Sequence, residues 1–178
     1  MKRLIALTAV ALLVPAAGAA ARPAAEKPKP LDGNAVIGFN GVGQIELGMT
    51  IAEARKAARR GIVGGSEVTT GCRHDTVLPR RFGLSTLRFK GKIRVLYVTR
   101  TAMPTAKGIR VNDSLDRLRS KYGSKLQERA SDVSLETRIF ELHGKGTREM
   151  QFSVNAQDKI FQIATGLRPE VDFSEGCA

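Results

Sequence analysis

Residues 43–55 read GQIELGMTIAEAR and residues 107–119 read KGIRVNDSLDRLR, and the two stretches align without a gap at a spacing of 107 − 43 = 64 residues. Each has an alternating apolar pair, a residue that tolerates positive φ, a hydroxyl residue that can cap a helix, and a helical run. The matched residues are Ile45 with Ile109, Leu47 with Val111, Gly48 with Asn112, Thr50 with Ser114, Ile51 with Leu115, Ala54 with Leu118 and Arg55 with Arg119. The sequence therefore predicts one structural unit that is used twice.

Each stretch predicts a short helix, over residues 51–59 and 115–122. Thr50 and Glu53 have the spacing of a capping box, and Gly123 is a typical residue to end the second helix. Helices this short are marginal by themselves, so each needs a surface on which to pack.

Alternating segments supply that surface. Residues 85–98 predict a hairpin that turns at Lys90-Gly91-Lys92, and residues 137–142, 149–154 and 159–164 predict three further strands. Residues 61–66, which are rich in glycine, are expected to form a loop after the first helix. We therefore predict an α+β fold over residues 36–178, in which each of two tandem repeats (about 36–102 and 103–178) packs a short helical segment on antiparallel strands.

The amino-terminal end has the features of a signal peptide at residues 1–21. Lys2 and Arg3 precede an apolar run that ends at Pro15, and small residues follow at the expected cleavage region. A transmembrane anchor is the alternative, but the run is too short for one. Residues 22–35 are rich in proline and charge and are expected to form an extended tether. We expect a periplasmic or secreted protein.

Cys72 and Cys177 are the only two cysteines. In an oxidising compartment an even number of cysteines favours a disulfide bond, and neither a four-ligand zinc site nor a CxxC redox motif is present. We predict that these two residues form a disulfide bond.

The chain is strongly basic, with a formal net charge of +12. Its cations gather on the first predicted helix and around the predicted hairpin turn, and they predict a basic face for an acidic protein or an anionic envelope component. That face consists of Arg55, Lys56, Arg59, Arg60, Arg88, Lys90, Lys92 and Arg94. The alternative is that these charges only keep a small exported domain soluble. Nucleic acid is not an expected partner, because the chain has no Trp and only two Tyr for base stacking.

Residues 45–54 (IELGMTIAEA) resemble the helix entry of the small outer-membrane assembly lipoproteins of the SmpA/OmlA type and of the beta-lactamase inhibitor proteins. The latter have two tandem copies of a helical segment with an antiparallel sheet. The resemblance implies a tandem α+β fold and, as an alternative function, a structural or assembly role at the cell envelope. Residues 105–111 (TAKGIRV) and the Glu-Gly-Cys ending at 175–177 are in addition similar to uncharacterised secreted bacterial proteins.

No set of nucleophile, base and orienting group with a known catalytic spacing is present. His74 and His143 are the only histidines, and neither belongs to a metal-binding motif. We therefore predict a non-enzymatic binding module that has no cofactor, no metal site and no catalytic residue. The oligomeric state is left open by the sequence.

Overall fold

The computed structural model describes residues 29–130 and 136–172. The predicted signal peptide and Cys177 lie outside these ranges. In them, a small sheet of β1 (Ile37–Gly38), β2 (Gly41–Val42) and β3 (Ile45–Glu46) precedes helix α1 (Ile51–Ala58). Four strands follow: β4 (Ile62–Thr69), β5 (Cys72–Val77), β6 (Leu84–Phe89) and β7 (Lys92–Val98), with a 3₁₀ turn at Arg80–Phe82. Helix α2 (Leu115–Tyr122), a 3₁₀ turn at Gly123–Lys125, and strands β8 (Gln127–Ala130), β9 (Arg138–His143), β10 (Arg148–Val154) and β11 (Ile160–Leu167) complete the described chain.

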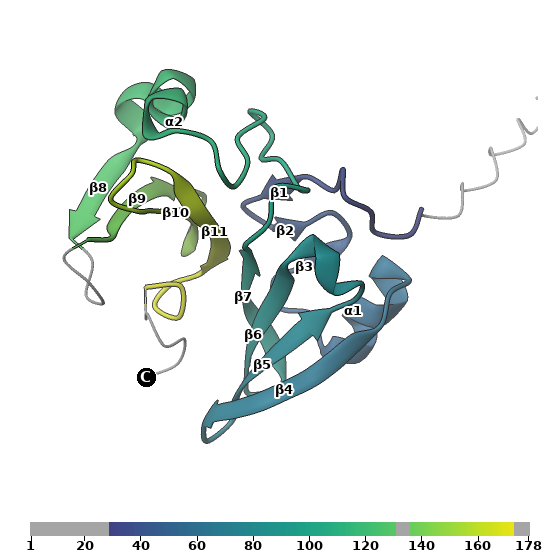
Figure 1. The fold of residues 1–178 in the computed structure, drawn as a ribbon. Coiled ribbons are helices and arrows are strands. Elements are labelled where there is room, and N and C mark those ends of the chain that lie inside the picture. Colours follow the sequence, from purple (N-terminus) through teal and green to yellow (C-terminus); the bar gives the residue numbers. More distant parts are fainter. Residues whose placement is uncertain (1–28, 131–135, 173–178) are drawn as a thin grey trace, which may run out of the picture.

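The large sheet contains eight antiparallel strands in the order β4-β5-β6-β7-β11-β10-β9-β8. Each group of four consecutive strands is a meander, and the two meanders join where β7 pairs with β11. Figure 1 shows α1 beside the β4–β7 meander and α2 beside the β8–β11 meander. The protein is therefore a mixed α+β structure dominated by antiparallel sheet, as the sequence predicts.

Both helices begin as predicted. The Thr50 side chain accepts a hydrogen bond from the Glu53 amide at 3.2 Å, and the Glu53 carboxylate accepts one from the Thr50 amide at 2.7 Å, which completes the capping box. Ser114 caps α2 by accepting from the Arg117 amide at 3.3 Å. These side chains satisfy amides that have no partner inside the helix.

The entry to each helix is also bonded to the large sheet. The Gly48 amide donates to the Ile93 carbonyl at 2.7 Å, and the Asn112 amide donates to the Ile160 carbonyl at 2.7 Å. Gly48 and Asn112 both have positive φ, of 88° and 75°. Glycine and asparagine adopt this conformation at low cost, so these two positions turn the chain from the sheet into the helix.

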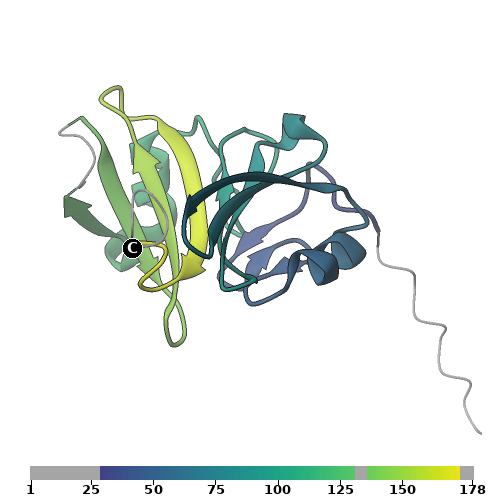
Figure 2. The same cartoon turned by 90° about the horizontal axis from the view of Figure 1, so that it is seen from below.

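A row of apolar side chains crosses the sheet on the face that the helices cover. Leu84, Val98, Ile163, Phe152 and Phe140 occupy paired positions on five adjacent strands and are all buried in the main core. Ala54 of α1 and Leu118 of α2 are buried in the same core, as are Ile37, Val42 and Ile45 of the small sheet. Figure 2 shows α1 and the small sheet on the same side of the first meander.

The opposite face changes character where the two meanders meet. Leu87 pairs with Val95, Val95 with Gly166, Gly166 with Glu149 and Glu149 with His143. Leu87 and Val95 belong to a second, smaller apolar cluster with Cys72 and Val171. This face is therefore apolar over the first meander and polar over the second.

Two expectations from the sequence are wrong in detail. Residues 61–66 do not form a loop, because β4 begins at Ile62. A Cβ atom on Gly65 would lie 2.3 Å from the His74 carbonyl oxygen, so glycine is required for the close approach of β4 to β5 at an irregular register. Packing also begins before Val36, because Leu31 is buried and its amide donates to the Ala58 carbonyl at 2.9 Å. The end of the predicted tether at residues 31–35 is therefore part of the folded domain.

Candidate functional site

The eight cations of the predicted basic face lie on or just after α1 and on the β6–β7 hairpin of the first meander. Arg55 and Lys56 are on α1, and Arg59 and Arg60 follow it. Arg88 is on β6, Lys90 is in the turn, and Lys92 and Arg94 are on β7. Lys92 Nζ on β7 lies 3.7 Å from Oε2 of Glu53 in the first turn of α1. The hairpin therefore lies next to the start of this helix.

Two of the arginines are bound to carboxylates of the protein itself. Arg88 makes two contacts with Asp75, at 3.1 and 3.3 Å, and Arg94 makes two with Glu170, at 2.9 and 3.2 Å. Asp75 and Glu170 are buried. Paired bonds between guanidinium and carboxylate fix both side chains, so Arg88 and Arg94 stabilise the fold and carry little uncompensated charge.

Two further arginines hold backbone carbonyls. The Arg55 guanidinium donates to the Ile62 carbonyl and so ties α1 to the start of β4. Arg60 Nε donates to the Leu31 carbonyl at 2.7 Å. Because a carbonyl oxygen is neutral, both guanidinium groups keep their full charge while their positions are fixed.

Lys56, Arg59, Lys90 and Lys92 are exposed. Arg59 ends α1 in the left-handed conformation, with φ of 51°. The charge around them is asymmetric: residues 29–102 hold 13 Lys and Arg against 5 Asp and Glu, a net of +8. The described residues from 103 onward hold 12 against 9, a net of +3. Most of the positive charge of the described chain is therefore carried by the first meander and the elements before it.

A group of polar side chains that we did not predict as a site lies on the second meander. We define the β9–β10 polar cluster as Glu141, His143, Glu149 and Gln151. Glu149 is paired in register with His143, and Gln151 with Glu141, so these four side chains share one face of two adjacent strands. Glu141, Glu149 and Gln151 are nevertheless buried. One ligand atom from each of Glu141, His143 and Glu149 lies within 4.8 Å of the other two.

Glu149 is the central residue of the cluster and is 0% exposed. Its Oε1 accepts a hydrogen bond from Gln151 Nε2 at 2.7 Å. Its Oε2 lies 3.1 Å from His143 Nδ1 and 3.4 Å from Arg168 Nε, yet neither contact has hydrogen-bond geometry. Burial raises the pKa of the Glu149 carboxyl above its ordinary value; the Gln151 hydrogen bond opposes this effect, and the charges of Glu141 and Asp172 add to it.

The signal that could have identified this cluster is the pair of segments Glu141-Leu142-His143 and Glu149-Met150-Gln151. In each, two polar residues flank one core residue, which places them on the face opposite Leu142 and Met150. The register of the hairpin was needed to bring the two segments together. A sequence pattern does not supply that register, so the sequence alone does not place His143 beside Glu149.

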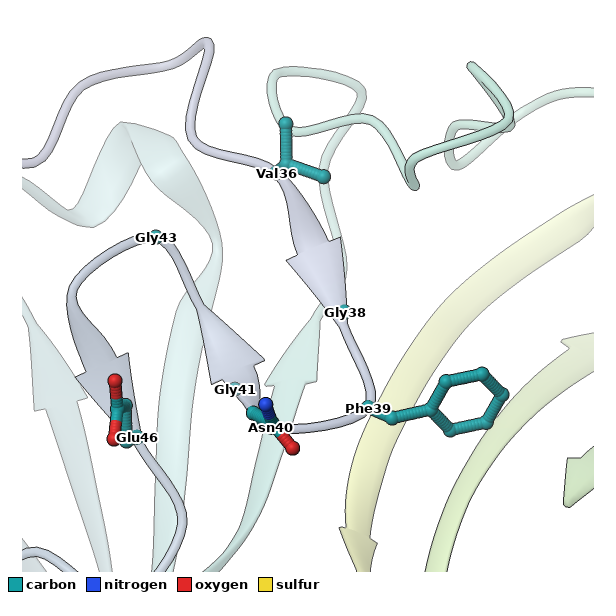
Figure 3. A pocket seen from close by; sticks show the side chains of 7 residues that line it. All are labelled: Val36, Gly38, Phe39, Asn40, Gly41, Gly43 and Glu46. Atoms are coloured by element: carbon teal, nitrogen blue, oxygen red, sulfur yellow. The ribbon is translucent and has the colours of Figure 1, made fainter. Parts of the chain in front are cut away.

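Two surface cavities lie next to elements described above. Figure 3 shows a cavity of about 400 Å³ lined mainly by glycine-rich backbone of the small sheet, with Glu46 as its charged side chain. A second cavity, of about 480 Å³, shares only His143 with the β9–β10 polar cluster and is lined by Phe39, Lys107, Tyr122, Lys125, Gln127, Leu142 and His143. His143 therefore lines this cavity and also lies close to buried Glu149.

The other histidine, His74, packs against Tyr97 with a ring separation of 5.7 Å. Burial lowers its pKa, and the charge of Asp75 opposes that change. Within the described ranges, no helix has the length and apolar character needed to cross a membrane.

Comparisons with known proteins show the fold alone. No protein-family model and no curated protein matches the chain. The crystal structure of the uncharacterised protein yfeY from Escherichia coli is similar, with a TM-score of 0.53 and 16% sequence identity over 75% of this chain and 99% of that one.

Proposed function

We propose that the protein is an exported, non-enzymatic binding module whose first meander presents a basic face to an anionic partner, either an acidic protein or an anionic envelope polymer. The observation that carries this proposal is the charge asymmetry, +8 for residues 29–102 against +3 for the described residues that follow. Clustered positive charge attracts anionic surfaces and accelerates their association.

The contacts of these cations support two different roles within the basic face. Arg88 and Arg94 are neutralised by Asp75 and Glu170, and they hold the strands in place. The exposed Lys56 and Lys90 are left to meet the partner, together with the guanidinium groups held at backbone carbonyls. Long exposed side chains on a rigid sheet and helix form a contact surface without requiring a pocket.

We also propose that the fold arose from two copies of one unit, in agreement with the resemblance to the tandem beta-lactamase inhibitor proteins. Positions 64 residues apart have equal roles: Gly48 and Asn112 at the turns, and Thr50 and Ser114 at the caps. The β7–β11 pairing supports this proposal. Leu96 pairs with Thr165, Val98 pairs with Ile163, and a shift of 67 residues (163 − 96 = 67 and 165 − 98 = 67) exchanges the two pairs.

Binding to anionic probes at increasing salt tests the proposed function. Poly-L-glutamate represents an acidic protein, and vesicles with anionic lipid represent the envelope. We expect saturable binding to one of them that weakens several-fold as salt rises and the Debye length falls below about 8 Å. Binding that is absent, or insensitive to salt, would contradict the proposal.

A pair of matched variants separates a specific face from net charge. Lys56→Glu with Lys90→Glu alters the proposed face, and Lys145→Glu with Lys159→Glu makes the same change in charge at exposed positions of the second meander. We expect the first variant to bind several-fold more weakly than the second. Equal losses would show that overall charge, and not this face, drives binding.

A further inference from the structure

We propose that the β9–β10 polar cluster binds a divalent transition-metal ion through Glu141, His143 and Glu149, with zinc as the ion best suited to the donors. The sequence pattern by itself assigns no metal to this protein. The proposal is independent of the basic face, which lies on the other meander.

The backbone brings these donors together. Glu141 and His143 are two residues apart on β9, and Glu149 faces His143 from β10. Four-coordinate zinc with bonds of about 2.0–2.2 Å holds neighbouring ligand atoms about 3.3–3.6 Å apart. The separation of 3.1 Å between His143 Nδ1 and Glu149 Oε2 is close to that spacing, and all three donors are within 4.8 Å of one another. Small movements of these side chains toward one another would bring all three donors within bonding distance of one ion.

The second observation is the orientation of Glu149. Gln151 Nε2 donates to Glu149 Oε1 and also to Asp172 Oδ1, at 2.7 and 3.1 Å, so one carboxylate oxygen is fixed. The other oxygen, Oε2, is buried, points toward His143 and has no hydrogen-bond partner. A buried carboxylate oxygen without a hydrogen bond is costly, and a metal ion would satisfy it. An outer amide that orients a ligating carboxylate is a common feature of metal sites.

Two arginines contact the carboxylates that would bind the metal ion, so their charges must be considered. Arg129 pairs with Glu141, and Arg168 Nε lies 3.4 Å from Glu149 Oε2. Glu141 and Glu149 each lie beside one of these guanidinium groups, and Asp172, which accepts a hydrogen bond from Gln151, adds a third carboxylate, so these groups carry an excess of one negative charge (3 − 2 = 1) when the imidazole is neutral. The Arg168 side chain is 44% exposed and can turn into solvent when a cation arrives.

The donor types select the metal. One imidazole nitrogen with two carboxylates suits zinc and its first-row neighbours better than magnesium or calcium, which prefer oxygen alone. Three protein ligands leave a coordination position for water. His143 is 32% exposed, so this side of the cluster is open to solvent.

Titration of the metal-stripped full-length protein with zinc chloride, followed by calorimetry, tests this site. We expect one zinc ion per chain, and a cobalt(II) complex with visible absorption bands. His143→Gln and Glu149→Gln should each weaken zinc binding by about tenfold or more. His74→Gln is the matched control, because it removes the other histidine and should leave the affinity unchanged. Circular dichroism shows whether each variant is folded.

Arg168→Gln separates a metal site from a closed ion-pair network. Removing a positive charge beside Glu149 Oε2 should tighten zinc binding several-fold. No saturable zinc binding to the unaltered protein, or binding that His143→Gln leaves unchanged, would overturn the proposal.

Discussion

Arg88 Nε lies 3.1 Å from Oδ2 of Asp75, a carboxylate with a side chain that is only 2% exposed. The two residues lie on adjacent strands, β6 and β5, and a second contact at 3.3 Å makes the pair bidentate. An arginine from the predicted binding face is therefore also part of the fold. This relationship determines how substitutions in that face must be interpreted.

Arg88→Gln should be strongly destabilising, because it leaves the buried Asp75 without a counter-charge. We expect the free energy of unfolding to fall by about 3 kcal/mol. Lys90→Gln in the adjacent turn should change it by about 0.5 kcal/mol or less. Urea denaturation measures both. Equal stabilities for the two variants would show that the Arg88 pair has no structural role.

Thr50→Ala should destabilise α1 by about 1 kcal/mol, because it removes the acceptor for the Glu53 amide. Bonds from the Thr50 backbone and side chain, with a smaller effect of Lys92, lower the pKa of Glu53. A carboxyl with a lowered pKa contributes stability that is present above its ordinary value of 4.5 and is lost as pH falls through its value in the folded protein. The stability difference between the unaltered protein and Thr50→Ala should thus shrink in acid, as denaturation at pH 7 and pH 3 would reveal.

Both tyrosines should ionise at higher pH than free tyrosine. Burial raises the pKa of Tyr97 to about 12. It also raises that of Tyr122, where a hydrogen bond to Thr105 opposes the effect. Because the chain has two Tyr and no Trp, tyrosinate absorbance reports these groups alone. The fast phase of an alkaline titration should lack a step near pH 10, and a step of full amplitude there would contradict the packing of Tyr97.

Reduction should lower the thermal stability of the protein if Cys72 and Cys177 are bonded as predicted. Cys72 is buried in an apolar cluster with Val171, so the chain at residue 171 already lies on the sheet face that holds Cys72. A bond that closes a loop of about a hundred residues contributes about 4–5 kcal/mol. A loss of roughly 10 °C in melting temperature is expected on reduction. Free-thiol titration of the denatured, unreduced protein provides the check, since two reactive thiols would rule out the bond.

Much of the architecture could be predicted because its signals are local. Thr50 and Glu53 define the start of α1 by their spacing, and Gly123 ends α2. The turn at Lys90 and Gly91, both with positive φ, joins β6 to β7 as the alternating pattern predicts. The sequence does not predict strand β4 because Gly65 has a steric role, the close approach to His74, which becomes visible only when β5 is in place.

In the candidate sites, too, some features are visible in the sequence and others depend on the folded structure. The cations of the basic face are evident in the sequence, but their pairing is not, because Glu170 lies 76 residues from Arg94. The β9–β10 polar cluster depends on register, since a shift of one residue would move Glu149 to the core face. Gly166 has a further role: a Cβ atom there would lie 2.8 Å from Val171 Cβ, so glycine admits the turn that brings Arg168 and Asp172 to the cluster.

The sequence by itself determined where the helices begin, the β6–β7 hairpin, the strands β9 to β11, the α+β class and the excess of positive charge, because each depends on residues close together along the chain. Only the tertiary structure decided that the two meanders join at β7 and β11. It also decided that Arg88 and Arg94 form ion pairs with carboxylates of the protein itself, and that His143 faces a buried glutamate. These features depend on strand order and register. Both are chosen by the packing of the whole core, in which no single segment specifies its partner.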